Sequence, residues 1–358
     1  MSSMAIHAKR YHIDPDDEAT ARAGSASVLD LVLMRVRLRA QRRAAWLTHL
    51  GDGAGTRAPS AWDGGLAACL DSRDTPESET GWYESCEAVK PLNAALAQVE
   101  SALAADSGAR LCQLSSLFGL SASELDLLQA SLAIAIEPAL ETVYGYLQRS
   151  PRRSYATGSL AARLFGYGHR SLWNPAGPLA LWKLVICGET SVGEHSPLSV
   201  DPLVTDWLHG EWHIDSELVG LLDVVEPQTA SESWPVAATA RLIQRAVERG
   251  SAIRLVLAGP PASGRRTFAA TVGARFGIQA LSIDLSEVSD SNWPDIVVRG
   301  QRLAVMGGAA LVWHGSQLHR PWPNTVVPVP IQFIACDVDQ VVSPCHLVID
   351  HRVELLAP

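Results

Sequence analysis

The sequence lacks three features that would each point to a class of protein. Its 358 residues include six cysteines, none in a C-x-x-C pair, so neither a zinc ribbon nor a redox-active dithiol is indicated. No apolar run approaches the roughly 20 residues that span a bilayer, and the N-terminus is too polar for a signal peptide. The formal net charge of −9 argues against nucleic acid as a general partner. We therefore expect a cytoplasmic protein with no metal site and no membrane partner.

The first 110 residues are expected to form a helical region that is interrupted by a flexible connector at 51–81. Residues 26–50 have apolar positions at roughly helical spacing, and Ser25 or Ser27 is placed to cap the helix. The middle of this helix is basic, with arginines at 35, 37, 39, 42 and 43. Such a helix suits a membrane surface or an acidic partner, or else a solvated or intersubunit face. We favour the second interpretation.

Residues 111–226 are expected to form a winged-helix-like domain of helices and a small ribbon. Short helices with a break at Gly119 precede two candidate strands, at 179–188 and 196–204. Ser121 followed by Glu124 has the spacing of a capping box. Small helices closed by a two-stranded ribbon are the pattern of a winged helix.

The charge of this domain bears on whether it binds DNA. Between Glu100 and Asp223, seven Lys and Arg stand against fourteen Asp and Glu. DNA binding requires the opposite balance, because neutralised phosphates supply most of the non-specific affinity. A local basic cluster occurs at Arg149, Arg152 and Arg153. We expect protein partners and no specific DNA binding, with a DNA-binding regulator as an alternative.

A second domain, residues 227–358, is expected to begin with a linker and continue as an α/β fold. Five strand-like apolar runs alternate with helical or loop segments. Apolar runs of this kind are typical of a parallel sheet buried on both faces in a three-layer α/β domain. The ligand crevice of such a domain lies at the carboxyl ends of the strands.

The first of these strands leads into a degenerate phosphate-binding loop. In a working loop, backbone N–H groups hold the phosphates, a lysine reaches the β- and γ-phosphates, and a hydroxyl binds Mg²⁺. Here arginines stand at the lysine and hydroxyl positions, and the threonine comes one residue late. The candidate binding residues are Gly259, Pro260, Gly264, Arg265, Arg266 and Thr267.

The end of the third strand gives an independent indication about catalysis. A hydrolytic site needs two acids there, one for Mg²⁺ and one to polarise water. This strand ends with His314 and Gly315 instead. Because two separate requirements fail, we expect no catalytic residues and no active hydrolysis.

The loop still has positive charge beside the free N–H groups of a helix N-terminus, which favours an anion over a magnesium nucleotide. One interpretation is weak, metal-independent binding of ATP, ADP or phosphate. The other is that Arg265 and Arg266 turn outward and pair with acids of a neighbouring subunit. We favour the second and assign no firm cofactor.

Residues 111–226 and 236–358 together resemble bacterial AAA+ proteins that pair a variant winged-helix domain with AAA+ modules. The segments that carry the resemblance are LFGLSASELDLL, YGYLQRSPRR, NPAGPLALWKL, PLSVDPLVTDWLHG and GPPASGRRTFAATVGARFG. In the family pattern, Gly259 and Gly264 match, Arg265 stands at the lysine, and Asp337 lies near the polar sensor position. The resemblance implies an AAA+-like core, here without the helical lid that would follow the fifth strand.

The resemblance also implies a function and partners. Such proteins are associated with phage-tail-like contractile injection systems, where they help assemble or terminate the particle, and their first, degenerate AAA+ module is followed by a motif-complete one. We therefore expect a non-hydrolysing assembly component that contacts tail or baseplate proteins and forms a homo-oligomeric ring in its full-length form. The alternative is the N-terminal part of an active ATP-dependent remodeller, so the sequence leaves open whether the protein is an enzyme.

Overall fold

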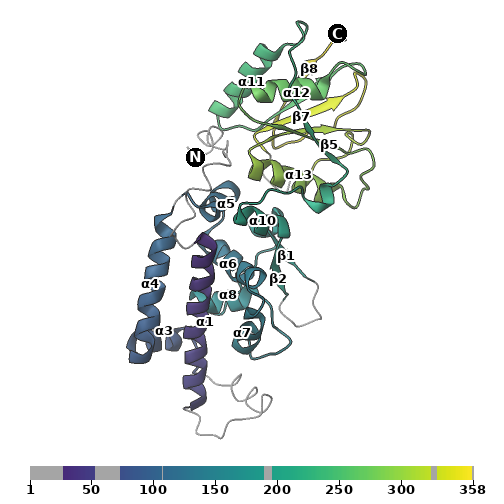
Figure 1. Ribbon diagram of the computed structural model, residues 1–358. Helices are drawn as coiled ribbons and strands as arrows, with labels where there is room; N and C mark the ends of the chain where they lie inside the picture. The colour runs from purple at the N-terminus through teal and green to yellow at the C-terminus, as the bar shows by residue number, and fades with distance from the viewer. Residues whose placement is uncertain (1–26, 53–72, 107, 189–195, 324–328, 357–358) are drawn as a thin grey trace. The chain divides into compact units, whose positions relative to one another are not determined.

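The computed structural model describes residues 27–52, 73–106, 108–188, 196–323 and 329–356 (Figure 1). These residues form two compact units, one ending at His213 and the other beginning at Ile214. None of the helices in the described ranges is both long enough and apolar enough to cross a membrane.

The first unit is mainly helical. Its elements are α1 (Val28–Asp52), α3 (Pro76–Ser85), the 3-10 helix η2 (Glu87–Val89), α4 (Lys90–Ala105), α5 (Arg110–Phe118), α6 (Ala122–Ile136), α7 (Leu140–Leu147), α8 (Gly158–Phe165), α9 (Pro178–Leu181), β1 (Val185–Cys187), β2 (Leu198–Val200) and α10 (Pro202–His209). The helices and the small ribbon that the sequence predicts for a winged-helix domain are therefore present.

Helix α1 is the predicted basic helix, and it lies at the centre of the first unit. Ser27 caps it, because its hydroxyl accepts from the Asp30 N–H at 3.2 Å while the Asp30 carboxylate accepts from the Ser27 N–H at 3.0 Å. Val32 and Val36 are fully buried. Since α1 packs against α3, α4, α6, α7 and α8, the N-terminal helical region and the helices after residue 110 form one unit.

The local signals around α6 are confirmed. Gly119 ends α5 in the left-handed conformation, at φ +65°, and the capping box between Ser121 and Glu124 starts α6. The two predicted strands are shorter than expected. Pro178 begins the short helix α9 before β1, and Asp201 caps α10 directly after β2, accepting from the Leu203 N–H at 3.0 Å.

The ribbon of the first unit is antiparallel, with Val185 opposite Val200. A single β-bridge between Ala156 and Leu198 adds a third segment beside β2. This bridge places the start of α8 next to the ribbon, and α6 packs against β2 and α9 against β1.

The second unit contains a six-stranded sheet and its covering helices. Its elements are η3 (Ser216–Leu218), β3 (Leu222–Val225), α11 (Val236–Glu248), β4 (Ile253–Ala258), α12 (Arg265–Ala274), β5 (Ala280–Asp284), α13 (Trp293–Gly307), β6 (Ala310–His314), β7 (Ile331–Cys336) and β8 (Ile349–Glu354). All five predicted apolar runs are strands.

The strand order of this sheet is β3-β5-β6-β7-β4-β8. The five predicted strands are parallel, whereas β3 pairs antiparallel with β5, so the sheet is mixed and mostly parallel. Residues 222–225 fall within the range 111–226 that the sequence predicts for the winged-helix-like domain. That prediction is corrected because Leu222 to Val225 pair with Ile283 to Ala280 of the second unit. The sequence did not predict β3 as a strand, because it has only four residues, all partly or fully exposed, and so shows no apolar periodicity.

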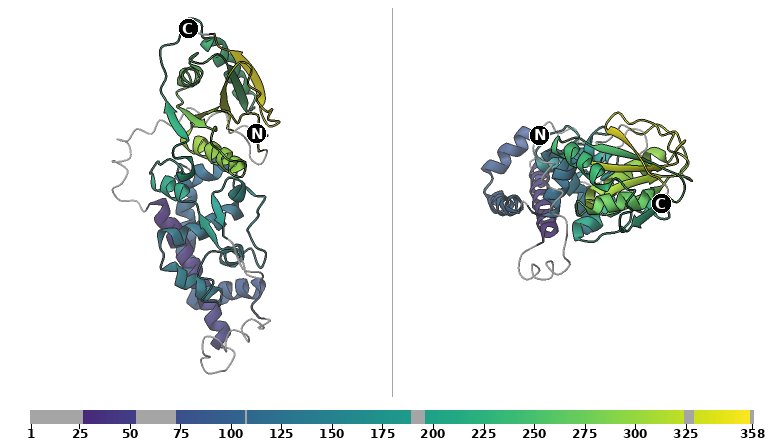
Figure 2. Two further views of the ribbon diagram at one scale, coloured as in Figure 1. Left: turned by 90° about the vertical axis from the view of Figure 1, so that its right-hand side faces the viewer. Right: turned by 90° about the horizontal axis from the view of Figure 1, so that it is seen from above.

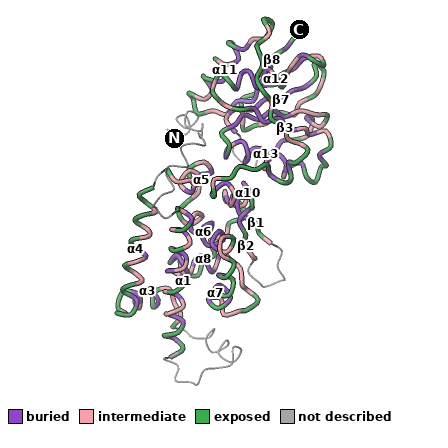
Figure 3. Tube along the Cα trace, viewed as in Figure 1, coloured by how far each residue is buried: buried purple, intermediate pink, exposed green. Residues whose placement is uncertain are grey.

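Helices cover both faces of the sheet (Figures 1 and 2). One core lies between the sheet and helices α11 and α12, and it includes the fully buried Leu255, Phe268 and Phe333. On the other face, Gly300 of α13 lies so close to the sheet that an added Cβ would be 2.6 Å from Ile283 and 2.8 Å from Trp313. Strands β4 and β7 are buried along their whole length, as the purple trace of β7 shows in Figure 3. Three layers therefore meet around the buried strands.

Candidate functional site

The candidate site of the second unit begins at the loop between β4 and α12. Gly264 caps α12 in the left-handed conformation, at φ +74°. An added Cβ there would also lie 2.6 Å from the ring of Trp234. Conformation and crowding therefore both require glycine at this position. Ala262 takes the same left-handed region without being glycine, at φ +65°. The sequence predicted this loop, and the structure places it at the carboxyl end of β4.

Arg265 turns back into the loop. Its Nη1 donates to the carbonyl oxygen of Gly259 at 2.9 Å and to Oδ1 of Asp337 at 2.6 Å. Asp337 directly follows β7, the strand beside β4. The prediction that Arg265 turns outward toward a neighbouring subunit is therefore wrong, because its guanidinium already has an acceptor and a counter-ion within the same unit.

Arg266 lies on the outer side of the helix start and also has an acid nearby in its own unit. Its Nη1 is 3.6 Å from a carboxylate oxygen of Asp223 on β3. Both side chains are well exposed, at 47% and 74%, so solvent screens this pair strongly. Arg266 therefore keeps most of its freedom to meet another anion.

His314 stands at the end of β6, where a hydrolytic site would carry an acid. Burial lowers the pKa of His314, and although the neighbouring Asp284 opposes this effect, the pKa stays below its ordinary value. The ring is thus neutral at neutral pH. Nε2 of His314 is buried without a hydrogen-bond partner among the described residues, and Nδ1 is 3.8 Å from Asp284. His314 supplies no negative charge to this edge.

Asp284 ends the neighbouring strand β5. Partial burial raises the pKa of its carboxyl, but hydrogen bonds from the side chain and the backbone N–H of Ser286, the latter at 2.9 Å, outweigh that effect and hold the pKa below its usual value. An added Cβ at Gly315 would meet this same carboxylate at 2.8 Å. Gly315 therefore leaves room for the turn at Asp284 and contributes no chemistry.

These residues surround an open cleft of about 810 Å³ at the carboxyl ends of the parallel strands. Its lining is Ala262, Gly264, Arg265, Arg266, Thr267, His314, Gly315, Ser316, Ala335, Asp337, Asp339 and Gln340. Four of the six predicted binding residues line the cleft, whereas Gly259 and Pro260 belong to the loop behind it.

Sequence reasoning missed the contribution of the segment after β7. Gln340 donates to the Gly315 carbonyl at 2.7 Å and accepts from the Asp337 N–H at 3.2 Å, so it joins the ends of β6 and β7. Asp339 adds a second carboxylate to the lining. The one signal in the sequence was the position of these polar residues directly after a buried strand, because such residues lie at the edge of the ligand crevice.

The charges of the cleft nearly cancel, because two arginines face two aspartates. An entering anion must compete with Asp337 for Arg265. In the described ranges, no three His, Cys, Asp or Glu side chains lie close enough together to hold a metal ion.

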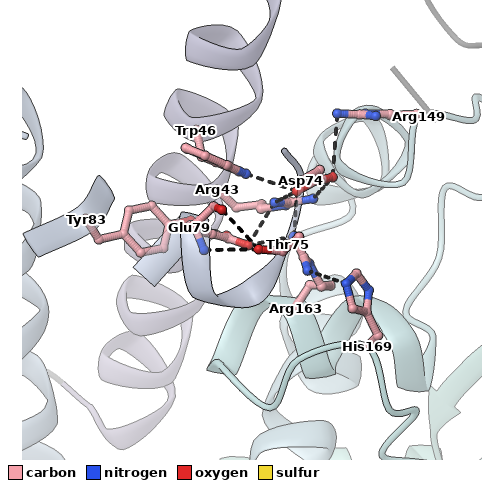
Figure 4. A network of polar contacts seen from close by, with 10 residues as sticks. Arg43, Trp46, Asp74, Thr75, Glu79, Tyr83, Arg149, Arg163 and His169 are labelled. Carbon is pink, nitrogen blue, oxygen red and sulfur yellow. Dashed lines mark hydrogen bonds and ion pairs between the residues drawn. The ribbon is translucent and has the colours of Figure 1, made fainter. Parts of the chain in front are cut away.

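The first unit contains a second cluster of charged side chains, centred on Asp74 and Glu79 (Figure 4). Arg43 of α1 binds both oxygens of Asp74, at 2.8 and 2.9 Å, and binds Glu79 at 2.8 Å. Arg163 of α8 binds Asp74 at 2.6 Å and Glu79 at 2.7 Å. Arg149 is 3.6 Å from Asp74. This network joins α1, the start of α3, α8 and the turn after α7.

The network changes the pKa values of its members. Burial raises the pKa of Asp74, but hydrogen bonds from Arg43 and from the Trp46 indole outweigh it, so the pKa lies well below its usual value. Burial and the adjacent Glu79, which accepts from the Tyr83 hydroxyl, hold the pKa of Tyr83 well above its usual value. Asp74 is thus ionised and the Tyr83 phenol neutral over the ordinary pH range.

The other arginines of α1 also point toward partners in the same unit. Arg35 binds Glu100 at 3.0 Å and Asp126 at 2.5 Å. Arg39 also binds Glu100, and Arg37 binds Glu137. These pairs argue against a face that is open to a membrane or to solvent, whereas a face for an acidic partner or for another subunit stays a prediction. The acids that pair with the arginines of α1 are 31 to 100 positions away in the chain, which is why the pattern of the helix alone misled.

Comparison with known families decides the identity of this unit. Residues 20–222 match the family model of the variant winged helix domain, and this match covers more than half of the 358 residues. The chain belongs to that family. No curated protein matches it.

In this variant winged helix domain, α8 is the last helix of more than four residues before the ribbon. A helix that reads DNA must present an open face with side chains that reach base edges. Six of the eight residues of α8 are buried, and its one arginine, Arg163, lies in the ionic network. Arg39 adds a hydrogen bond to the Leu164 carbonyl at 3.1 Å. The helix is thus packed as an internal element of the variant winged helix domain.

Proposed function

We propose that this protein is a non-hydrolysing, AAA+-like component that helps assemble a contractile injection (phage-tail-like) particle through protein contacts. The observation that carries the proposal is that Nη1 of Arg265 donates hydrogen bonds to both the Gly259 carbonyl and the Asp337 carboxylate. A residue that should hold phosphate is used instead to tie the loop to the end of β7.

The chemistry of the cleft supports the absence of hydrolysis. Phosphoryl transfer relies on a cation for the phosphates, a hydroxyl and an acid for Mg²⁺, and a group that orients water. Arg265 is paired, Arg266 replaces the hydroxyl, and His314 is neutral. Mg²⁺ prefers oxygen ligands, which neither a guanidinium nor an imidazole provides. We propose that the cleft binds ATP, ADP or phosphate weakly and without Mg²⁺.

The fold of the second unit supports the AAA+-like assignment. The 259–264 loop joins a fully buried parallel strand to the N-terminus of a helix, and the cleft lies at the carboxyl ends of the strands. Phosphate-binding loops occupy this place in α/β folds, because the helix N-terminus carries free N–H groups and positive dipole charge. Keeping this architecture without the catalytic groups suits a module that works by packing and docking.

The first unit supports a protein-docking role over a DNA-binding one. Its arginines on α1 and α8 are neutralised by acids of the same unit, so they are not available to phosphates. A unit whose α1 and α8 arginines are paired with acids, and which carries more acids than bases between Glu100 and Asp223, is suited to the surface of another protein. We propose tail or baseplate proteins as its partners.

A genetic experiment tests this function. Deleting the gene in a host that makes such a particle should lower the yield of complete particles counted by electron microscopy. Complementation with the Thr267→Ala chain, which lacks the hydroxyl in the first turn of α12, should restore the yield as well as the parent chain does. Unchanged particles after deletion, or failure of this variant to complement at equal protein level, would contradict the proposal.

A further inference from the structure

The open edge of the large sheet is the feature that carries a further inference. β8 is the last strand in the sheet order and pairs with β4 on one side. Among the described residues, no strand pairs with its other side. Ile349 to Arg352 are exposed in succession. An edge of this length without proline or a bulge can accept another strand.

The register of β8 with β4 shows which backbone groups face outward. The Ile349 N–H donates to the Ala252 carbonyl at 3.1 Å, and the Leu355 N–H donates to the Ala258 carbonyl at 2.8 Å. Because successive residues of a strand direct their N–H and C=O groups to opposite sides, the residues between them with even numbers face the open edge. These are Asp350, Arg352 and Glu354.

Apolar side chains lie beside this edge. Ile349 is 52% exposed although it belongs to a strand of the sheet. Leu347 and Leu356 flank the strand and are also exposed. Val338 is a fourth exposed apolar residue. It lies near β8, because its carbonyl oxygen accepts a hydrogen bond from the Arg352 side chain at 2.7 Å. Apolar surface next to unpaired backbone groups is typical of a strand that meets a partner strand.

We propose that β8 pairs antiparallel with β8 of a second copy of this chain, with His351 on the two-fold axis. In this register, Asp350 lies opposite Arg352 of the second copy, and the symmetry repeats that pair. Ile349 lies opposite Val353 of the second copy, so the exposed apolar side chain gains an apolar neighbour.

The alternation of charge along β8 selects this register over its neighbours. The outward N–H and C=O groups belong to even-numbered residues, so an even-numbered residue must pair with an even-numbered residue of the second copy. The two-fold axis therefore passes through a residue and not through a peptide bond. An axis at Arg352 would place Arg352 opposite its own copy and Asp350 opposite Glu354. An axis at Asp350 would place Asp350 opposite itself. Like charges directly opposite destabilise a sheet, so these two registers are disfavoured. An axis at Val353 would place Arg352 opposite Glu354, but it would pair only the last three residues of β8 and leave Ile349 outside the contact. The register centred on His351 pairs opposite charges and also covers Ile349.

Asp350 can take part without losing its present role. It binds Arg254 of β4 through both oxygens, at 2.6 Å each, and its side chain is still 35% exposed. A carboxylate has about four acceptor positions, so a second guanidinium can approach from the open side. The contact would join two sheets into one and does not depend on the chemistry of the cleft.

Sedimentation velocity on the full chain over a hundredfold concentration range tests the proposal. We expect a monomer–dimer equilibrium that Arg352→Glu weakens at least about tenfold, because two opposite-charge pairs become like-charge pairs. Arg245→Glu, the same charge change on an exposed position of α11, should leave the equilibrium unchanged. A monomer throughout, or an equal effect of both variants, overturns the proposal.

Disulfide trapping tests the register itself. In a parent chain whose native cysteines are replaced, His351→Cys places two sulfurs on the axis at a spacing that a disulfide can bridge. Ile349→Cys faces Val353 of the second copy and should not cross-link to itself. Under mild oxidation we expect covalent dimer from the first variant alone. Equal cross-linking of both variants, or none while the parent dimerises, overturns the proposal, and melting curves confirm that each variant is folded.

Discussion

Nη1 of Arg265 lies 2.6 Å from Oδ1 of Asp337, and the two residues are 72 positions apart in the sequence. The pair joins the start of α12 to the end of β7 across the candidate cleft. It gives the arginine a structural role at the position where a phosphate-binding loop uses a cation.

Releasing Arg265 should strengthen anion binding. Asp337→Asn removes the counter-ion while keeping the size of the side chain. Because Asp337 is 62% exposed, its pair with Arg265 is weak, and we expect the affinity for ATP without Mg²⁺ to rise roughly fivefold. Isothermal titration calorimetry measures this change, with Asp339→Asn as the control for lost charge in the same cleft. Equal gains in both variants would show that overall charge, and not the freed arginine, is responsible.

The ionic network of the first unit should be important for its stability. Asp74→Asn leaves Arg43 and Arg163 without one of their carboxylates in a largely buried place. Breaking such a pair by removing one partner costs about 3 kcal/mol. Urea denaturation followed by circular dichroism should show this loss. Glu84→Gln, an exposed acid on the same helix α3, should change the free energy of unfolding by less than about 0.5 kcal/mol. Similar effects of both substitutions would contradict a special role for the network.

Acid should weaken the first unit for the same reason. The pKa values of Asp74 and Glu100 are lower in the folded chain than in the unfolded chain, so the unfolded chain binds protons first as the pH falls. The stabilisation is therefore complete well above the unfolded values of 3.8 and 4.5 and is lost progressively as the pH falls from about 5 through the lower pKa values of the folded chain. Urea denaturation at pH 7, 5, 4 and 3 should show a steep fall between the last two values that is smaller in Asp74→Asn. A flat profile in the parent chain would contradict this account.

The variant winged helix domain should not bind DNA tightly. Its arginines on α1 and α8 are paired within the unit, and Arg149 of the basic RSPRR segment lies near Asp74. Fluorescence anisotropy with a labelled random duplex should show no binding at sub-micromolar protein in 50 mM salt. Salt-sensitive binding that disappears after Arg149→Ala, Arg152→Ala and Arg153→Ala together would instead support a DNA-binding regulator.

Local sequence signals predicted most of the elements but not the contacts between them. Caps and breaks such as Ser27, Gly119 and the Ser121–Glu124 box act over a few residues, so they could be found in the sequence. The four buried strands β4 to β7 were also found, because parallel strands covered on both faces are continuous apolar runs, and the largely exposed β8 was found as a fifth run. The order of the strands had no such signal, and the short antiparallel β3 was missed.

In the candidate cleft, too, the local elements were predicted but the contacts between them were not. Its loop and the end of β6 were predicted from spacing, and the structure brings them together. The direction of the Arg265 side chain could not be predicted. The residues next to Arg265 in the sequence do not show whether its guanidinium pairs with Asp337 or with an acid of another subunit. The basic helix misled for a related reason, since its counter-ions come from α3, α4 and α6.

The most direct test of the central claim is phosphate release from ATP by the purified chain with excess Mg²⁺. Gly264→Ala is the matched control, because Gly264 has φ +74° and an added Cβ would strike Trp234, so this change disrupts the loop itself. The account predicts that phosphate release from the parent chain equals that of buffer and that the variant is no slower. Sustained turnover by the parent that is lost in Gly264→Ala would show that the loop is a working nucleotide site.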